Sequence, residues 1–76
     1  MKLKATIVVS EDINIIEKAF MPEMKSLQKE RSSVSLKKNK DTLVFTIKAK
    51  DSTALRSTMN GITKLLTVYE KTKGVK

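Results

Sequence analysis

The sequence predicts an α+β fold, a β-α-β-β-α two-layer sandwich in which a three-stranded antiparallel sheet carries both helices on one face. Three observations lead to this prediction. Residues 2–9 and 42–49 alternate apolar and polar side chains, which is the period of a half-buried strand. A shorter alternating segment, 33–37, is joined to 42–49 by the turn-forming residues 39–41, which indicates a hairpin. From about Ser52 onward, apolar residues recur at steps of three and four, as on one face of a helix.

The first strand and the helix after it occupy the N-terminal part of the chain. The core-facing residues of the strand are expected to be Leu3, Ala5, Ile7 and Val9. Ser10 suits the N-cap of the helix, and the acidic pair at 11–12 suits its first turn. Pro22 is expected to end this helix, because proline removes a backbone donor and restricts the residue before it. Residues 23–32 are polar and are expected to form a connector or a frayed helical end.

The segment 42–49 is the most β-prone of the chain and is expected to be the central strand. Its core-facing residues would be Leu43, Phe45, Ile47 and Ala49, and those of segment 33–37 would be Val34 and Leu36. A helical crossover returns the chain parallel to its first strand, and the hairpin then reverses it. Segment 42–49 therefore runs antiparallel to both 2–9 and 33–37 when it lies between them.

The final helix begins at a strong N-cap, Asp51, whose carboxylate can accept from the free N–H groups of the first turn. Its core stripe is predicted to be Leu55, Met59, Ile62, Leu66 and Tyr69. Gly61 lies in mid-helix, where glycine costs roughly 1 kcal/mol relative to alanine. This cost predicts close packing at Gly61, for example by a second backbone. Residues 71–76 are expected to form a loose basic tail of a single domain, 1–76.

The apolar arc of this helix is wider than one core stripe, because Ala54, Gly61, Leu65 and Val68 extend it. The surplus predicts that a partner's helix docks on the stripe formed by Ser57, Gly61, Leu65 and Val68. Arg56 and Asn60 lie together on the polar flank. They would either line the rim of that contact or, for Arg56, form an ordinary surface ion pair worth under about 1 kcal/mol.

Composition disfavours an enzyme. The chain of 76 residues contains no Cys and no His, which removes the commonest metal ligands and the commonest general base. Its carboxylates are scattered, and its two glycines cannot supply a phosphate-binding fingerprint. We therefore expect no catalytic residues, cofactor, metal or small-molecule substrate. No apolar run is long enough to span a membrane, and no signal peptide is apparent, so a cytoplasmic protein is expected.

Positive charge is the strongest compositional feature, with sixteen Lys and Arg against eight Asp and Glu. The polar face of the predicted sheet is basic and carries Lys2, Lys4, Lys37, Lys48 and Lys50. These lysines would either contact the phosphates of a nucleic acid or another polyanion, or serve solubility alone. Base-specific binding is disfavoured, since the only strand aromatic, Phe45, is expected on the core side rather than on the open face.

Residues 49–60 read A-K-D-S-T-A-L-R-S-T-M-N, and this pattern, A-x-D-x-x-A-L-R-x-x-x-N at the start of a final helix, resembles a known family. Residues 21–23 (M-P-E) and 30–34 (E-R-S-S-V) extend the likeness, which covers roughly residues 3–70. The family is the small dimerisation subunit of the KEOPS complex, related to the CTAG antigens. Gly61 departs from the pattern, since another small residue such as serine is typical there.

This resemblance implies a non-catalytic scaffold subunit. Members of the family dimerise by joining sheets edge to edge, and their helices contact the catalytic subunit, a tRNA threonylcarbamoyltransferase. The resemblance thus implies a homodimer, or a heterodimer with a paralogue. The unpaired edges of the predicted sheet indicate that the subunits would join through segment 33–37 or segment 2–9. The alternative from another class is a stand-alone basic nucleic-acid-binding module.

Overall fold

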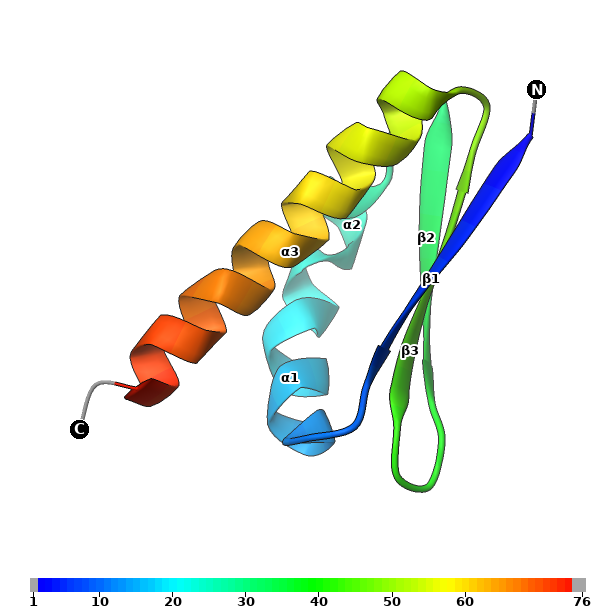
Figure 1. Ribbon diagram of the computed structural model, residues 1–76. Coiled ribbons are helices and arrows are strands. Elements are labelled where there is room, and N and C mark those ends of the chain that lie inside the picture. The colour runs from blue at the N-terminus through cyan, green and yellow to red at the C-terminus, as the bar shows by residue number, and fades with distance from the viewer. Residues whose placement is uncertain (1, 75–76) are drawn as a thin grey trace.

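The computed structural model describes residues 2–74, and the side chains of residues 2–71. Three strands form one sheet, and all the helices lie on the same face of it (Figure 1). The elements are β1 (Leu3–Val9), α1 (Ile13–Phe20), the 3-10 helix η1 (Met21–Glu23), α2 (Met24–Leu27), β2 (Ser32–Lys38), β3 (Leu43–Ala49) and α3 (Ser52–Gly74). The predicted α+β sandwich is confirmed.

The sheet has the order β1-β3-β2, and both pairs are antiparallel. This confirms that the most β-prone segment occupies the centre, where a strand is paired on both sides. The registers align Thr6 of β1 with Thr46 of β3, and Thr46 with Ser35 of β2. Thr6 and Ser35 therefore end the same row of side chains, one at each edge of the sheet.

The core lies between β3 and the helices. Leu43, Phe45 and Ile47 of β3 are fully buried, together with Ile62 of α3. The ring of Phe20 meets that of Phe45 edge to face at 4.8 Å, a favourable geometry for two aromatic rings. The core-facing residues predicted for the central strand are thus confirmed, since Ala49 is buried as well.

The start of α1 differs from the prediction. The residue at the N-cap is Asp12, in a left-handed conformation with φ 52° and ψ 36°, and the helix begins at Ile13. Ser10 is therefore not the N-cap, and the acidic pair precedes the first turn. Aspartate tolerates this backbone region better than most residues. The hydroxyl of Tyr69 on α3 donates a hydrogen bond of 2.8 Å to Asp12 Oδ2, which ties this turn to the last helix.

The chain stays helical after α1, which corrects the prediction of a connector. Pro22 lies in the first positions of η1, where its missing N–H costs nothing, and α2 continues the helical path to Leu27. Leu27 is buried in the core. Pro22 therefore changes the type of helix, and only residues 28–31 connect this layer to β2.

Asp51 caps α3 as predicted, since its Oδ1 accepts from the N–H of Ala54 at 2.8 Å. The helix extends to Gly74, so residues 71–74 are helical rather than a loose tail, and residues 75–76 lie outside the described part. Basic residues are favourable near a helix C-terminus, where the helix dipole attracts positive charge. Of the predicted core stripe, Ile62 is fully buried, and the other residues are half-buried against the core: Leu55, Met59, Leu66 and Tyr69.

Candidate protein-interaction and polyanion-binding surfaces

The predicted docking stripe lies along the flank of α3 that faces α2. Ser57 and Val68 are exposed, while Leu65 is half-buried against the core. Arg56 and Asn60, the predicted rim residues, are both exposed. The stripe therefore exposes one polar side chain, Ser57, and one apolar side chain, Val68, to solvent.

Gly61 packs against its own domain. A Cβ built at this position would lie 3.1 Å from Cδ2 of Leu27 on α2, closer than most Cβ contacts. The close packing expected at Gly61 is thus made by a side chain of the same chain and not by a second backbone. A bulky residue at this position would displace Leu27 from the core before it met any partner.

Exposed large apolar side chains are concentrated on the helix layer. Ile15 of α1, Met21 of η1 and Val68 of α3 are each more than half exposed, at 57%, 60% and 55%. Val8, at 59%, is the fourth such residue among the side chains that the structure describes, and it lies on the open face of the sheet. Apolar groups of this size at the surface favour contact with another protein when they occur together on one layer.

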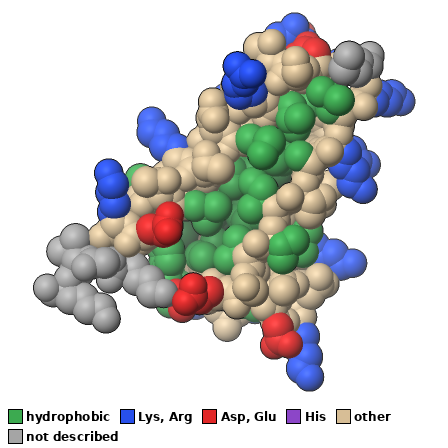
Figure 2. All heavy atoms as spheres, in the orientation of Figure 1, with side chains coloured by type: hydrophobic (Ala, Val, Ile, Leu, Met, Phe, Trp, Pro, Cys, Tyr) green, Lys and Arg blue, Asp and Glu red, His purple; other side chains and the backbone are tan. Residues whose placement is uncertain are grey.

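A strip of hydrophobic surface runs between α3 and β1 (Figure 2). At the end of the strip near α1, Ile7 and Val9 face Leu66 and Tyr69 across a depression of about 680 Å³. The core-side residues of β1 are half-buried rather than buried, because β1 is an edge strand and no other strand of residues 2–74 pairs beyond it. The strip is thus core-like surface that the domain itself leaves partly uncovered.

The outer edge of β2 is occupied by the chain's own polar groups. The amide of Gln28 pairs with the backbone of Val34 in both directions. Its Nε2 donates to the carbonyl at 2.8 Å, and its Oε1 accepts from the N–H at 3.1 Å. Two residues before Val34 on this edge, Ser32 exchanges backbone hydrogen bonds of 2.9 and 3.4 Å with Lys29. Sequence reasoning missed this cap, because an amide can imitate a neighbouring strand only where the fold places it.

Farther along the same strand, Lys38 is exposed, and its ammonium group reaches α1 of the helix layer. Its Nζ lies 3.7 Å from Glu17 Oε1 and also contacts the side-chain oxygen of Asn14. A charged side chain at a sheet edge discourages another strand from pairing there. The outer edge of β2 is therefore protected at both of its ends.

The outer edge of β1 lacks such protection. The N–H and C=O groups of alternate residues in an edge strand point away from the sheet. Because Val34 of β2 bonds outward to Gln28, β2 pairs with β3 through the β3 residues Val44, Thr46 and Lys48. The alternate β3 residues therefore bond to β1. The β1 residues whose N–H and C=O groups point outward are then Lys4, Thr6 and Val8. Within residues 2–74 the outward N–H groups of these three β1 residues donate no hydrogen bond, and their outward C=O groups accept none.

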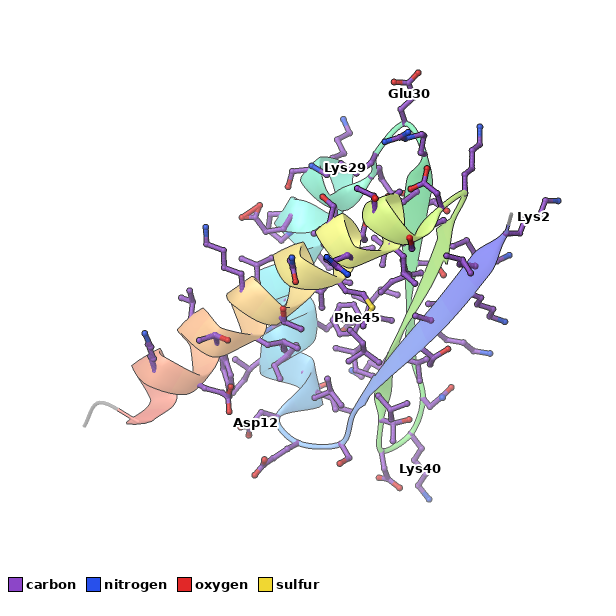
Figure 3. The ribbon with its side chains drawn as sticks, turned by 45° about the horizontal axis from the view of Figure 1, so that its top comes forward. Lys2, Asp12, Lys29, Glu30, Lys40 and Phe45 are labelled. Carbon is purple, nitrogen blue, oxygen red and sulfur yellow. The ribbon has the colours of Figure 1, made fainter. Side chains whose placement is uncertain are left out.

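Four of the five predicted lysines come together. Lys2, Lys4, Lys48 and Lys50 line one depression of about 560 Å³, and Lys37 lies toward the other end of the sheet. Lys29 and Arg31 also line it, and Figure 3 places Lys29 and Glu30 at the end of the sheet opposite Lys40. Residues 29–31 approach the end of β3, where the N–H of Lys50 donates to the carbonyl of Arg31. The spacing of residues in the sequence does not reveal this tertiary contact.

The basic depression is electrostatically unfavourable without a counter-ion. Lys4 and Lys48 lie directly opposite each other on adjacent strands, and like charges in that arrangement repel. Arg31 is partly neutralised by Asp51 at 3.4 Å, although both side chains are exposed, so this pair is weak. Phosphate oxygens are a chemical group that would relieve the repulsion.

Within the described part of the chain, no group of three or more carboxylates gathers in a geometry suited to a metal ion. Residues 2–74 also contain no helix with the length and apolar composition that crossing a membrane requires. The aromatic ring on the central strand, Phe45, faces the core, as predicted, and not the open face where bases would stack.

These observations define a small α+β domain with exposed apolar side chains on its helix layer, an open edge strand and a basic depression. A scan against protein-family models matches residues 2–73 to the model described as "Transcription factor Pcc1". The chain belongs to the Pcc1 family, which is a family of non-catalytic subunits of the KEOPS complex, and this agrees with the resemblance found in residues 49–60. Searches of the curated proteins and of the solved structures gave no match.

Proposed function

We propose that this chain is a dimerisation and scaffold subunit of a KEOPS complex in the cytoplasm, and that its helix layer docks the catalytic subunit, the tRNA threonylcarbamoyltransferase. The family match over residues 2–73 carries the proposal. The exposed apolar side chains of α1, η1 and α3 support it, because these elements form one layer and are the helices that the resemblance implies in docking.

Val68 offers the sharpest test of the docking surface. Val68→Asp would place a charge among apolar contacts and should abolish co-purification with the catalytic subunit. The free domain should keep its fold, because Val68 is 55% exposed. Thr63→Asp is the matched control, since Thr63 is exposed on the same helix but lies away from the docking stripe. Equal recovery of the catalytic subunit with the parent and with Val68→Asp would contradict the docking proposal.

Gly61 is a poor position for this test, although a partner contact near it remains part of the proposed surface. A leucine there would collide with Leu27 and would perturb the core, so lost binding could not be attributed to the interface. Ser57→Trp is a better second variant, because Ser57 is exposed and a large side chain there would block only an approaching partner.

The proposed dimer is a homodimer, or a heterodimer with a paralogue. A domain of 76 residues buries only roughly 60% of the surface that its unfolded chain exposes, so association would supplement its core. Light scattering of the purified chain at roughly tens of micromolar should give the mass of a dimer. A monomer mass under these conditions would contradict the homodimer, and the paralogue would then be the remaining partner.

We also propose that the basic depression contacts tRNA phosphates within the assembled complex. Lys48→Glu combined with Lys50→Glu should weaken tRNA binding and lower the salt slope by roughly one to two, because fewer phosphates are neutralised. Lys37→Glu with Lys40→Glu makes the same charge change at the other end of the sheet, and should have a smaller effect. Unchanged affinity and slope across about 50–200 mM salt would mean that the lysines serve solubility alone.

The same lysines favour a second candidate function, binding of nucleic acid by the domain alone. If the chain is a scaffold subunit, the isolated chain should bind tRNA and duplex DNA equally and weakly, with dissociation constants in roughly the micromolar range or above, since it lacks stacking residues on the open face. Sequence-selective, tight binding of DNA by the isolated chain would favour this alternative over the scaffold.

A further inference from the structure

We propose that the basic depression at one end of the sheet is a binding site for a short chain of linked phosphate groups, as in inorganic triphosphate or the triphosphate of a nucleotide. The proposal concerns the domain by itself, so it goes beyond the contact with tRNA proposed for the assembled complex. It depends on how the positive charges are arranged on the open face of the sheet and on where they stop.

The polar groups of the depression form two rows across the three strands. The first row contains two lysines and a serine hydroxyl, which the register places directly beside one another: Lys4, Lys48 and Ser33. The second row continues this register by two residues and contains three cations: Lys2, Lys50 and Arg31. Neighbouring strands lie about 4.8 Å apart and alternate residues of a strand about 7 Å apart, so the backbone positions of both rows span roughly 10 Å by 7 Å.

Residues 29–31 make this end of the sheet concave. The carbonyl of Arg31 accepts from the N–H of Lys50 at 2.9 Å, which holds the turn beside the end of β3. Lys29 also lines the depression, and Figure 3 shows Lys29 and Lys2 at the same end of the sheet, opposite Lys40. The volume of about 560 Å³ is suited to a small ligand, since such sites measure roughly 300–1,000 Å³.

The positive charges of the depression are poorly balanced by the chain. Six cations line it against one carboxylate, that of Glu30. Lys4 and Lys48 are directly opposite each other, an unfavourable arrangement for like charges. A concave surface of one sign concentrates its field on a ligand of the opposite sign. A compact polyanion would therefore be attracted into the depression and would relieve the repulsion there.

The positive charge stops after these two rows. The next row along the strands carries three hydroxyl groups and no charge: Thr6, Thr46 and Ser35. In the row after that, Val8 and Val44 lie beside Lys37. An extended nucleic-acid backbone would leave the cations after a short path, whereas a short chain of linked phosphates keeps all its charge among them. The arrangement thus favours a ligand of concentrated negative charge.

Recognition would involve the phosphates and not a base. The aromatic rings of Phe20 and Phe45 meet in the core, and Tyr69 is bonded to Asp12 on the helix side, so none of the described aromatic rings is available on the open face. Lysine ammonium groups bind phosphate as point charges, and a guanidinium can donate two parallel N–H bonds. Inorganic triphosphate and ATP should therefore bind with the same affinity.

Isothermal titration calorimetry of the isolated chain with a series of phosphates tests the size of the site. Affinity should rise from phosphate to diphosphate to triphosphate, because each added group meets further cations. A longer polyphosphate should bind at most a few-fold tighter than triphosphate, since the row that contains Thr46 adds no charge. The titrations use magnesium-free buffer of about 0.1 M ionic strength, in which exposed charges more than about 10 Å apart are largely screened.

A pair of double variants tests the position of the site. Lys4→Gln with Lys48→Gln should weaken triphosphate binding by roughly tenfold or more, because charge-assisted hydrogen bonds to phosphate are lost. Lys37→Gln with Lys40→Gln is the matched control, since it removes the same charge from exposed positions at the other end of the sheet, and it should bind as the parent does. Circular dichroism checks that both variants remain folded.

Four results would overturn the proposal. They are no measurable binding of triphosphate, equal weakening in both double variants, an affinity that grows steadily with the length of the polyphosphate, and much tighter binding of ATP than of inorganic triphosphate. The second and third would mean a general attraction of the basic chain for polyanions, and the fourth would mean recognition of the nucleoside. The scaffold proposal would stand in each case, because co-purification with the catalytic subunit tests it separately.

Discussion

The two edges of the sheet differ in how their backbone groups are satisfied. At β2 the chain supplies a side-chain amide, a backbone bridge and a lysine that reaches α1. At β1, Lys4, Thr6 and Val8 keep outward groups without a partner in the described chain. A domain with one open edge can add one neighbour and then stops, whereas two open edges allow growth without limit. Within the described residues, β1 is therefore the edge at which a further strand can pair without displacing an existing hydrogen bond.

Removal of the amide cap should have the largest effect on this asymmetry. Gln28→Ala leaves the N–H and C=O of Val34 without their partner and should lower the free energy of unfolding by about 2 kcal/mol. It should also make the β2 edge available, so species larger than a dimer should appear in size-exclusion chromatography. Gln28→Glu keeps the acceptor but loses the donor, and an intermediate result is expected. Unchanged stability in urea would mean that water replaces the amide fully.

A smaller loss is expected where β2 is anchored to α3. Ser32 and Thr58 share a buried hydrogen bond of 2.6 Å. Thr58→Val leaves the Ser32 hydroxyl buried without a partner, so we expect a loss of about 1.5 kcal/mol in urea denaturation. Combining it with Ser32→Ala removes both polar groups and should recover part of the loss. A double variant less stable than either single one would contradict this explanation.

The cap of α3 should contribute about 1 kcal/mol, because Asp51 accepts from the N–H of Ala54. Asp51→Ala should lose this amount in thermal or urea unfolding. Asp51→Asn keeps a capping oxygen and loses only the exposed ion pair with Arg31, next to the start of β2, so its loss should be smaller. Equal losses would assign the effect to the ion pair instead of the cap.

The smallest effect is expected at the far end of β2. Lys38→Met keeps the aliphatic stem but removes the ion pair with Glu17, and should cost under about 0.5 kcal/mol. Lys40→Met is the control, since Lys40 lies at the hairpin turn and makes no ion pair in the described part of the chain. If Lys38→Met alone increases association at high concentration, the charge protects the edge; equal behaviour of both variants would remove Lys38 from the comparison.

Much of the fold follows from local pattern. The alternation in 42–49 identified the central strand, and the side chain of Asp51 identified the start of α3, because both signals act within a few residues. The strand order followed from the crossover and the hairpin. These predictions needed no knowledge of contacts distant in sequence.

The features that sequence reasoning missed depend on contacts across the fold. Asp12 adopts a left-handed conformation beside Tyr69, which follows it by 57 positions, while Ser10 had the better local signal for a cap. Pro22 is a local signal for the end of a helix, yet the 3-10 helix η1 accommodates it, and α2 then places Leu27 in the core. The bonds from the Gln28 amide to the edge of β2 were equally hard to predict, because they depend on where α2 ends in the fold.

The hydrogen bond between Tyr69 and Asp12 has a spectroscopic consequence. Tyr69 is the only tyrosine, and the chain has no tryptophan, so its ultraviolet emission comes from one side chain whose hydroxyl donates to a carboxylate at 2.8 Å. A phenol held by a carboxylate emits weakly, and it brightens when the bond opens. The fluorescence of the unlabelled protein therefore reports on one contact, the junction of α3 with the turn before α1, throughout an unfolding titration.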